Sequence, residues 1–173
     1  SSNIGSVKMA MDVGGERQQA FMKKLGFLDS SAIELPERGH PLVPNPWRPI
    51  NTMTISFGHG IAVSPIQLAN GVSSIVNGGV RHPATLLRRD STELLVGERV
   101  ISEKTSHAMR RLLRLVVEKG TGRNANAKGY LVGGKTGTAE KPGRGGGYRH
   151  KALLSRERPA LCGAGHGGRA ERQ

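Results

Sequence analysis

Residues 130–141 read YLVGGKTGTAEK, and two incompatible chemistries fit this stretch. Counted from Gly129, it matches the phosphate-binding pattern G-x-x-x-x-G-K-[ST], with Lys135 and Thr136 at the last two positions. Residues 135–137 alone form a K-T-G triplet, which is typical of a strand that binds a substrate beside a serine nucleophile. The flanking residues must distinguish the two interpretations, because a short motif has meaning only in its structural context.

The flanks argue against a phosphate loop. Such a loop follows a buried strand and opens a helix, whose N–H groups and dipole hold the phosphate. Residues 121–128 read TGRNANAK, which is too polar for a core strand. Downstream, Gly137, Pro142 and a run of glycines disfavour a helix. Nucleotide binding is therefore the less favoured alternative.

The strand interpretation gives each residue of the motif a task. Residues 130–132 lead into a strand predicted through the motif, and the Lys135 ammonium supplies positive potential near a serine. The hydroxyls of Thr136 and Thr138 can bind a substrate carboxylate, and Gly137 lets the substrate approach because it has no side chain. A solvated turn that contains these residues by chance remains open for so short a motif.

Composition bounds the other function classes. The formal net charge of +13 would suit nucleic acid, but aromatic residues make up only 3% of the chain and the basic residues are spread out. We predict no nucleic-acid partner. The single cysteine, Cys162, and six scattered histidines predict neither a metal site nor a cofactor.

Helix signals organise the chain before the motif. Two short helices are predicted up to Gly26, with Gly14-Gly15 as the break between them. The five prolines of residues 36–49 predict an irregular loop, and residues 51–63 are rich in β-branched residues but interrupted by glycines. Residues 80–100 suggest short extended pieces.

Two stronger helices are predicted further along. The first has Ser64 as its N-cap, Pro65 in its first turn and Gly78-Gly79 as its stop. The second runs from Ser102 to about Lys119, and a G-T-G sequence ends it. The residues predicted to face inward are Ile66, Ala69, Val72, Ile75 and Val76 in the first, and Met109, Leu112, Leu113, Val116 and Val117 in the second.

The chain opens on Ser1-Ser2-Asn3, which fits an S-x-N element. In an acyl-transfer site, the Ser1 hydroxyl can relay a proton and the Asn3 carboxamide can hold a substrate amide. A plain helix cap is the alternative for these residues.

With S-x-N and K-T-G in this order, the chain resembles the later part of the transpeptidase domain of class B penicillin-binding proteins, closest to the cell-division type. The resemblance covers about residues 1–155 and rests on the segments SSNIGSVKMA, TISFGHGIAVSPIQLANGVSSIVNGG, LLRLVVEKGTGRNA and GYLVGGKTGTAEK. It implies an α/β (α+β) fold similar to that of serine β-lactamases. Such a fold has a mainly antiparallel sheet between helical layers, and we expect it to be incomplete at both ends of this chain.

The resemblance also implies a function. Proteins of this family are D,D-transpeptidases that cross-link peptidoglycan stem peptides by serine acyl transfer during cell wall synthesis and septation, and β-lactams acylate the same serine. By position, Ser1, Asn3 and Lys135 would be catalytic, and residues 136–138 would bind substrate. The implied partners are stem peptides, divisome proteins and, for the intact protein, β-lactams. The parent protein would sit in the cytoplasmic membrane through an N-terminal anchor missing here, with this domain on the periplasmic side.

This chain departs from the family in two places. No serine is followed three residues later by lysine, so the S-x-x-K nucleophile is absent and we expect the fragment to be inactive alone. A non-catalytic remnant that binds peptidoglycan or divisome proteins is the alternative. Residues 156–173 are mostly Arg, Gly and Ala, and one shifted reading of a back-translation encodes an apolar strand instead. We therefore predict two regions, a partial transpeptidase domain over 1–155 and a frameshifted basic tail over 156–173.

Overall fold

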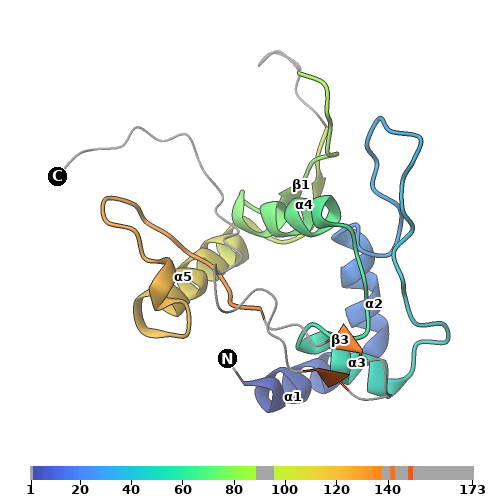
Figure 1. The fold of residues 1–173 in the computed structure, drawn as a ribbon, viewed down its shortest axis with the longest axis horizontal. Helices are drawn as coiled ribbons and strands as arrows, with labels where there is room; N and C mark the ends of the chain where they lie inside the picture. Colours follow the sequence, from blue (N-terminus) through green and yellow to red (C-terminus); the bar gives the residue numbers. More distant parts are fainter. Residues whose placement is uncertain (1, 89–95, 138–140, 143–147, 150–173) are drawn as a thin grey trace. The chain divides into compact units, whose positions relative to one another are not determined.

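A computed structural model describes residues 2–88, 96–137, 141–142 and 148–149 (Figure 1). The chain divides into two compact units: the first spans Ser2–His107 and the second begins at Ala108. In chain order, the elements are α1 (Asn3–Val13), α2 (Gly15–Lys24), α3 (Pro49–Ser56), α4 (Pro65–Val76), β1 (Val80–Arg81), β2 (Glu98–Arg99), α5 (Glu103–Lys119), the 3-10 helix η1 (Arg123–Ala125), β3 (Lys141–Pro142) and β4 (Tyr148–Arg149).

The first unit starts with the two predicted helices, and the break between them is confirmed at Gly14, which has φ 86°. Helices α1, α2 and α3 pack side by side, as Figure 1 shows. Thr52 of α3 is buried at their centre: its carbonyl accepts from Gln18 Nε2 at 3.1 Å and its hydroxyl from Trp47 Nε1 at 2.9 Å. These bonds fix the end of the proline-rich loop against the helices.

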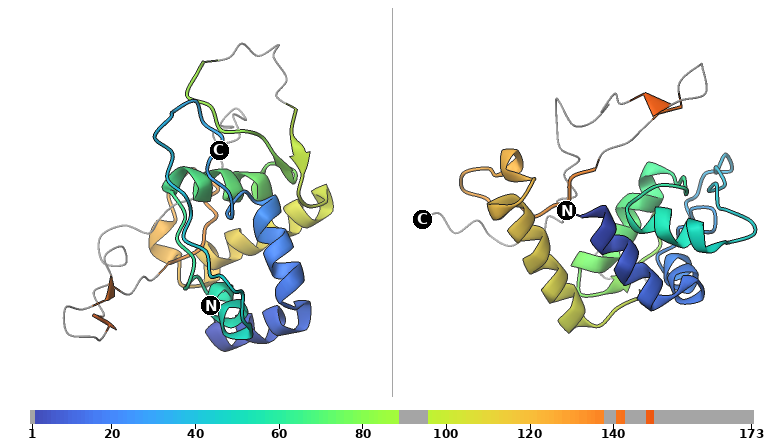
Figure 2. Two further views of the ribbon diagram at one scale, coloured as in Figure 1. Left: turned by 90° about the vertical axis from the view of Figure 1, so that its right-hand side faces the viewer. Right: turned by 90° about the horizontal axis from the view of Figure 1, so that it is seen from below.

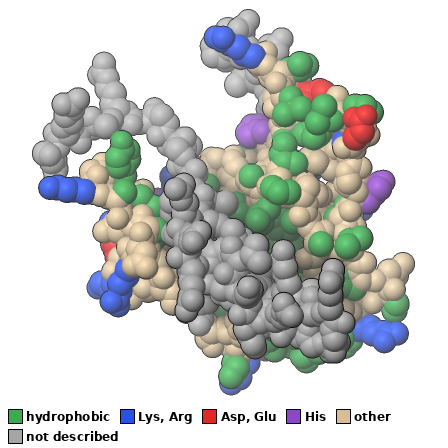
Figure 3. Space-filling view, in the orientation of Figure 1, with side chains coloured by type: hydrophobic (Ala, Val, Ile, Leu, Met, Phe, Trp, Pro, Cys, Tyr) green, Lys and Arg blue, Asp and Glu red, His purple; other side chains and the backbone are tan. Residues whose placement is uncertain are grey.

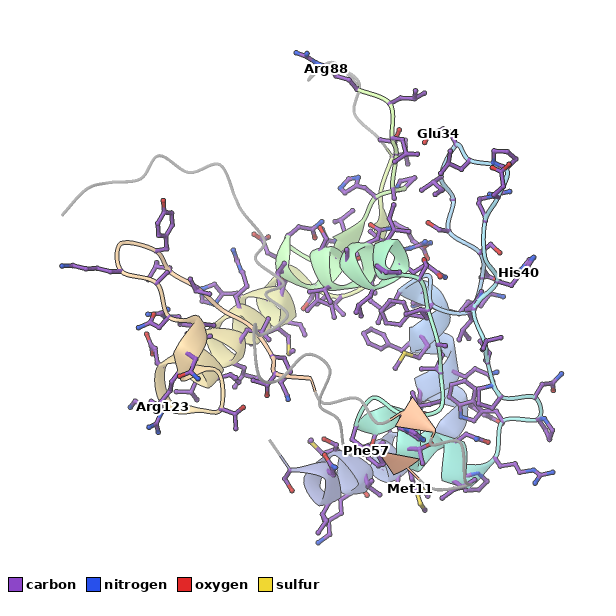
Figure 4. All side chains as sticks on the ribbon, viewed as in Figure 1. Met11, Glu34, His40, Phe57, Arg88 and Arg123 are labelled. Carbon is purple, nitrogen blue, oxygen red and sulfur yellow. The ribbon has the colours of Figure 1, made fainter. Side chains whose placement is uncertain are left out.

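No residue of α1 is buried, although much of the helix is apolar. Ile4 is 72% exposed, and Met9, Met11 and Val13 are also exposed. Figure 3 shows hydrophobic side chains at the surface of the described part of the chain, and Figure 4 marks Met11. Apart from the half-buried Val7, the larger apolar side chains of α1 are therefore exposed in the described part of the chain.

Helix α3 forms where the sequence is rich in β-branched residues. Pro49 occupies the first turn, where its missing N–H costs nothing, and the Arg48 backbone N–H donates to Asn51 Oδ1 at 2.8 Å. Thr52 and Ile55 are buried. Tertiary burial and the start signal therefore outweigh a local propensity of a few tenths of a kcal/mol per residue.

Helix α4 begins as predicted. The Ser64 hydroxyl accepts from the Gln67 N–H at 3.3 Å, and the Ser64 N–H donates to Gln67 Oε1 at 2.9 Å, which together form a capping box. Helix α4 lies beside β1, as the two views in Figure 2 show.

The inward face of α4 differs from the prediction. Ala69 is exposed, and the buried residues are Gln67, Gly71, Ser74 and Val76. The Gln67 amide donates to two carbonyls of the preceding segment, Gly26 O at 3.1 Å and Asp29 O at 2.7 Å. These bonds hold the side of α4 that carries Gln67 toward the interior. A prediction from the spacing of apolar residues does not find a buried polar side of this kind.

Replacing Ser64 with alanine should destabilise the full chain by about 1 kcal/mol, because the first turn of α4 loses its side-chain acceptor. Urea unfolding followed by circular dichroism measures this change. Ser73→Ala, at an exposed position of the same helix, is the matched control and should change stability by less than about 0.5 kcal/mol. Equal effects of the two substitutions would contradict the capping role.

The predicted short extended pieces are confirmed as an antiparallel pair, with Val80 opposite Arg99 and Arg81 opposite Glu98. Arg81 Nη2 and Glu98 Oε2 form an ion pair at 2.9 Å. Gly79, with φ 94°, precedes β1, and its carbonyl accepts from the Val100 N–H at 2.8 Å.

The loop after α2 is tied to the segment after β1. Glu34 accepts from the Thr85 hydroxyl at 2.5 Å and from the Leu86 N–H at 2.9 Å. The Ser30 hydroxyl lies 2.8 Å from Nδ1 of His40 in the same loop. Figure 4 marks Glu34 and His40. The prediction of an irregular segment over residues 36–49 is confirmed up to Pro49, where α3 starts.

The second unit is built on the later part of α5, whose predicted extent is confirmed. Val117 is 1% exposed, as predicted, but Leu112 is 55% exposed and its predicted inward position is wrong. The helix ends at the predicted G-T-G sequence, where the N–H groups of Gly120 and Gly122 both donate to Val116 O at 3.0 Å.

The described strands of the second unit are β3 and β4, which pair antiparallel. Among the described residues, 131–137 belong to no strand, so the strand predicted through K-T-G is not formed there. Ser1, Thr138 and the predicted tail 156–173 lie outside the described residues. No helix in the described ranges is long and apolar enough to cross a membrane.

Candidate active site

The K-T-G segment, residues 131–137, is held against α5 by hydrogen bonds to its own backbone groups. The Gly134 N–H donates to Leu113 O at 3.1 Å, and Arg114 Nη1 donates to Val132 O at 2.8 Å. These bonds satisfy an N–H and a carbonyl that a neighbouring strand would otherwise pair. Two backbone groups of residues 131–137 thus have partners on α5, although these residues belong to no strand.

Arg114 is itself fixed by two side chains. Its Nε donates to Glu118 Oε1 at 2.8 Å, one turn further along α5, and its Nη1 lies 3.3 Å from Asn126 Oδ1. The rigid guanidinium fork can hold several acceptors at once. Arg114 therefore joins α5, the loop after it and the lead-in to the K-T-G segment, and all of these lie within the second unit.

The motif residues themselves are accessible. Lys135 is exposed, and its Nζ donates to Thr136 O at 2.9 Å. Thr136 is half-buried, and its hydroxyl lies 2.9 Å from the hydroxyl of Thr121. A Cβ added at Gly137 would meet no atom within 4 Å, so the described part of the chain leaves open space there. The predicted approach of a substrate past Gly137 is compatible with this geometry.

The S-x-N element lies at the start of α1. Asn3 is the exposed first residue of the helix. Ser2 is the N-cap: its hydroxyl accepts from the Gly5 N–H at 3.1 Å, and its carbonyl accepts from the Ser6 hydroxyl at 3.1 Å. The cap predicted as the alternative for this triplet is therefore formed, by its middle residue, and Ser1 lies outside the described residues.

The phosphate-loop alternative lacks its structural context. In the described residues, Gly129 follows the 3-10 helix η1 and a turn, and residues 131–137 do not open a helix. A strand before the loop and a helix N-terminus after it are what make such a loop bind phosphate. The Lys135 and Thr136 side chains are thus not placed on a phosphate-binding turn.

Two pockets lie in the first unit. One, of about 250 Å³, is lined by Met11, Trp47 and Thr52 among others, and one of about 320 Å³ by Lys23, Gln67 and Arg81 among others. Neither is lined by a residue predicted to be catalytic or substrate-binding.

Sequence reasoning missed two residues that hold the K-T-G segment, Arg114 and Thr121. Thr121 lies in the G-T-G sequence, which was interpreted only as a helix stop, although a threonine between two glycines has no need to be there for that purpose. Arg114 gives no sequence signal, because a basic residue on an amphipathic helix is usually a solvated one.

The model of the penicillin-binding protein transpeptidase domain matches residues 1–155. The chain belongs to this family. The predicted resemblance and the transpeptidase-like α/β fold are thereby confirmed, and nucleotide hydrolysis is not supported.

Similar proteins support the assignment of the chain to this family. The chain is 40% identical over 144 residues to the probable peptidoglycan D,D-transpeptidase FtsI of Caulobacter vibrioides, and this match covers 82% of the chain and 24% of the relative. It is 37% identical over 153 residues to stage V sporulation protein D of Bacillus subtilis, again covering 82% of the chain and 24% of the relative. The chain thus spans about a quarter of the length of these two relatives.

Solved structures of the family have the same fold. The TP domain of penicillin-binding protein 3 from Burkholderia pseudomallei matches with a TM-score of 0.78 and 36% identity, over 86% of this chain and 46% of that one. Penicillin-binding protein 3 of Mycobacterium tuberculosis in complex with aztreonam matches with a TM-score of 0.76 and 30% identity, over 86% of this chain and 37% of that one. The fold of this chain is therefore that of part of a penicillin-binding transpeptidase domain.

Proposed function

We propose that this chain forms part of a peptidoglycan D,D-transpeptidase, which cross-links stem peptides by serine acyl transfer in cell wall synthesis and septation. The observation that carries the proposal is the K-T-G segment, held on α5 by Gly134 and Arg114 inside the region that matches the transpeptidase family. An accessible lysine, a hydroxyl and an open glycine follow one another there.

Each motif residue has a role in this proposal. The Lys135 ammonium stabilises negative charge that develops when a serine attacks a carbonyl. The hydroxyls of Thr136 and Thr138 bind the substrate carboxylate, and Gly137 leaves room for the substrate backbone. Ser1 relays a proton and Asn3 holds a substrate amide in the same reaction.

A chimera tests the proposal. In it, the residues of this chain replace the 144 aligned residues of the Caulobacter relative, which supplies the rest of the domain. We expect a fluorescent penicillin to label both the chimera and the parent relative covalently. A folded chimera that takes up no label, beside a labelled parent, would overturn the proposal.

The chain alone should not be labelled. It contains no S-x-x-K sequence, so the 173 residues hold no serine that the family would use as nucleophile. Incubation with fluorescent penicillin and denaturing electrophoresis should give no band above that of a heat-denatured control. A specific band that unlabelled penicillin competes away would show that another residue of this chain is acylated.

The second candidate is a non-catalytic remnant that binds peptidoglycan or divisome proteins, which requires no S-x-x-K serine in the chain. This candidate predicts that the full chain cosediments with purified peptidoglycan, whether or not the chimera is labelled. It fails if the chain stays in the supernatant while an intact family member sediments.

Localisation and chain organisation are part of the same proposal. We propose that the parent protein is anchored in the cytoplasmic membrane with this domain on the periplasmic side, and that stem peptides, β-lactams and divisome proteins are its partners. Residues 1–155 would be the domain part and residues 156–173 a frameshifted tail. The nucleotide sequence around Ser155 tests the last point, since an intact frame with the same tail in related genes would refute it.

A further inference from the structure

The hydroxyl of Thr121 lies 2.9 Å from that of Thr136, and this contact joins two segments 15 residues apart in the chain. Thr136 is the motif residue proposed to bind the substrate carboxylate. A threonine hydroxyl has one proton and can also accept, so its orientation decides whether that proton is available to a substrate. What Thr121 does to this hydroxyl therefore matters for the proposed reaction.

The turn that carries Thr121 is tightly constrained. The N–H groups of Gly120 and Gly122 both donate to Val116 O at 3.0 Å, so the turn folds back onto the last turn of α5. A Cβ at Gly120 would lie 2.8 Å from Val116 O and 2.9 Å from Val116 Cα, and one at Gly122 would lie 3.2 Å from the same oxygen. The two glycines allow this close approach, and the threonine between them is held in one place.

The Thr136 side of the contact is equally constrained. Gly134 and Val132 are bonded to Leu113 and Arg114 of the same helix. A Cβ at Gly133 would lie 3.3 Å from the Arg114 backbone nitrogen, so the segment lies directly on the helix backbone. Both segments that carry these hydroxyls are thus hydrogen-bonded to α5, and this helix sets the distance between the two hydroxyls.

We propose that Thr121 is a positioning residue for the substrate carboxylate. Its hydroxyl donates to Thr136 Oγ1, which orients the Thr136 proton away from Thr121 and leaves it available for the carboxylate. A hydroxyl that accepts one hydrogen bond is also a stronger donor in the next. The inference rests on the proposed function, because Thr136 has this task only in a transpeptidase site.

The test compares Thr121→Val with Thr121→Ser in the chimera described above. Valine keeps the shape of threonine and removes the hydroxyl, whereas serine keeps the hydroxyl. We expect Thr121→Val to lower the acylation rate constant for a fluorescent penicillin by about 3- to 10-fold, the effect of one ordinary hydrogen bond, and Thr121→Ser to stay within about twofold of the parent chimera.

A penicillin whose carboxylate is esterified separates positioning from general structural damage. Thr121→Val should leave its acylation rate unchanged, because the ester lacks the charge that the Thr136 proton binds. Equal losses for acid and ester, no loss for the acid, or an equally impaired Thr121→Ser would each overturn the proposal. Failure of the unmodified chimera to be labelled would instead overturn the proposed function.

Thr105→Val is the matched control. Its hydroxyl lies 2.8 Å from that of Ser102 in the first unit, so the substitution breaks a hydroxyl pair of similar length that includes no motif residue. We expect its acylation rate with the acid to equal that of the parent chimera. The melting temperature of each full-chain variant, measured by circular dichroism, shows whether Thr121→Val and Thr121→Ser fold alike.

Discussion

Replacing Lys135 with alanine in the chimera is expected to lower the rate of acylation by penicillin about 10²–10³-fold, as the loss of one preorganised charge or donor does in other acyl-transfer sites. Lys135 follows directly on Gly134, which the helix α5 holds through Leu113 O. Its ammonium is therefore carried on a fixed backbone, so its field should be preorganised for the developing negative charge. A time course of labelling with a fluorescent penicillin, quenched at set times, measures the rate.

Lys128→Ala is the control for this substitution. Lys128 is an exposed lysine of the same unit, seven positions earlier and outside the motif. The Lys128→Ala substitution removes the same charge from the second unit, so a general electrostatic effect would appear in both variants. A loss of less than about tenfold at Lys135, or a similar loss at both positions, would contradict the role proposed for the motif lysine.

Replacing Gly79 with alanine is expected to destabilise the full chain by at least about 3 kcal/mol. Gly79 has φ 94°, and a Cβ there would lie 2.2 Å from Ile101 O and 2.9 Å from Ile101 C. The clash is with backbone that leads into α5, so it cannot be relieved by rotating a side chain. The N–H of Val100 also donates to Gly79 O, and a shift of this residue would lengthen that bond.

The neighbouring Gly78 separates the clash from backbone strain. It has φ 102°, yet a Cβ there would meet no atom within 4 Å. Gly78→Ala should therefore cost only the strain of a left-handed alanine, about 1 kcal/mol. Urea unfolding of both variants measures the difference, and equal losses would show that the close approach to Ile101 does not exist in solution.

Much of the helical framework could be predicted from the residues that begin and end helices. The glycine break after α1, the Ser64 cap of α4 and the G-T-G end of α5 all depend on short-range backbone chemistry, which a sequence states directly. The inward faces were less predictable. Gln67 is buried because its amide donates hydrogen bonds to two carbonyls of a segment about 40 positions earlier in the chain. No local sequence pattern indicates these two bonds.

The candidate site shows the same division. The motif residues 135–137 were predicted from their order, because acyl transfer needs a cation, a hydroxyl and an open backbone in succession. The strand expected through them was wrong in the described residues, since Leu113 and Arg114 of α5 take the backbone partners. Which long-range group satisfies an N–H or a carbonyl depends on the tertiary fold, and a single sequence does not contain it.

Arg114 gives the proposed function a consequence for antibiotic selection. Its guanidinium holds Val132 O, three residues before Lys135, and its own position depends on Glu118 and Asn126. Substitutions at these positions would move the K-T-G segment without touching a bound β-lactam. We expect some drug-resistant alleles of such a protein to carry changes at Arg114, Glu118 or Asn126, where a survey restricted to the motifs would overlook them.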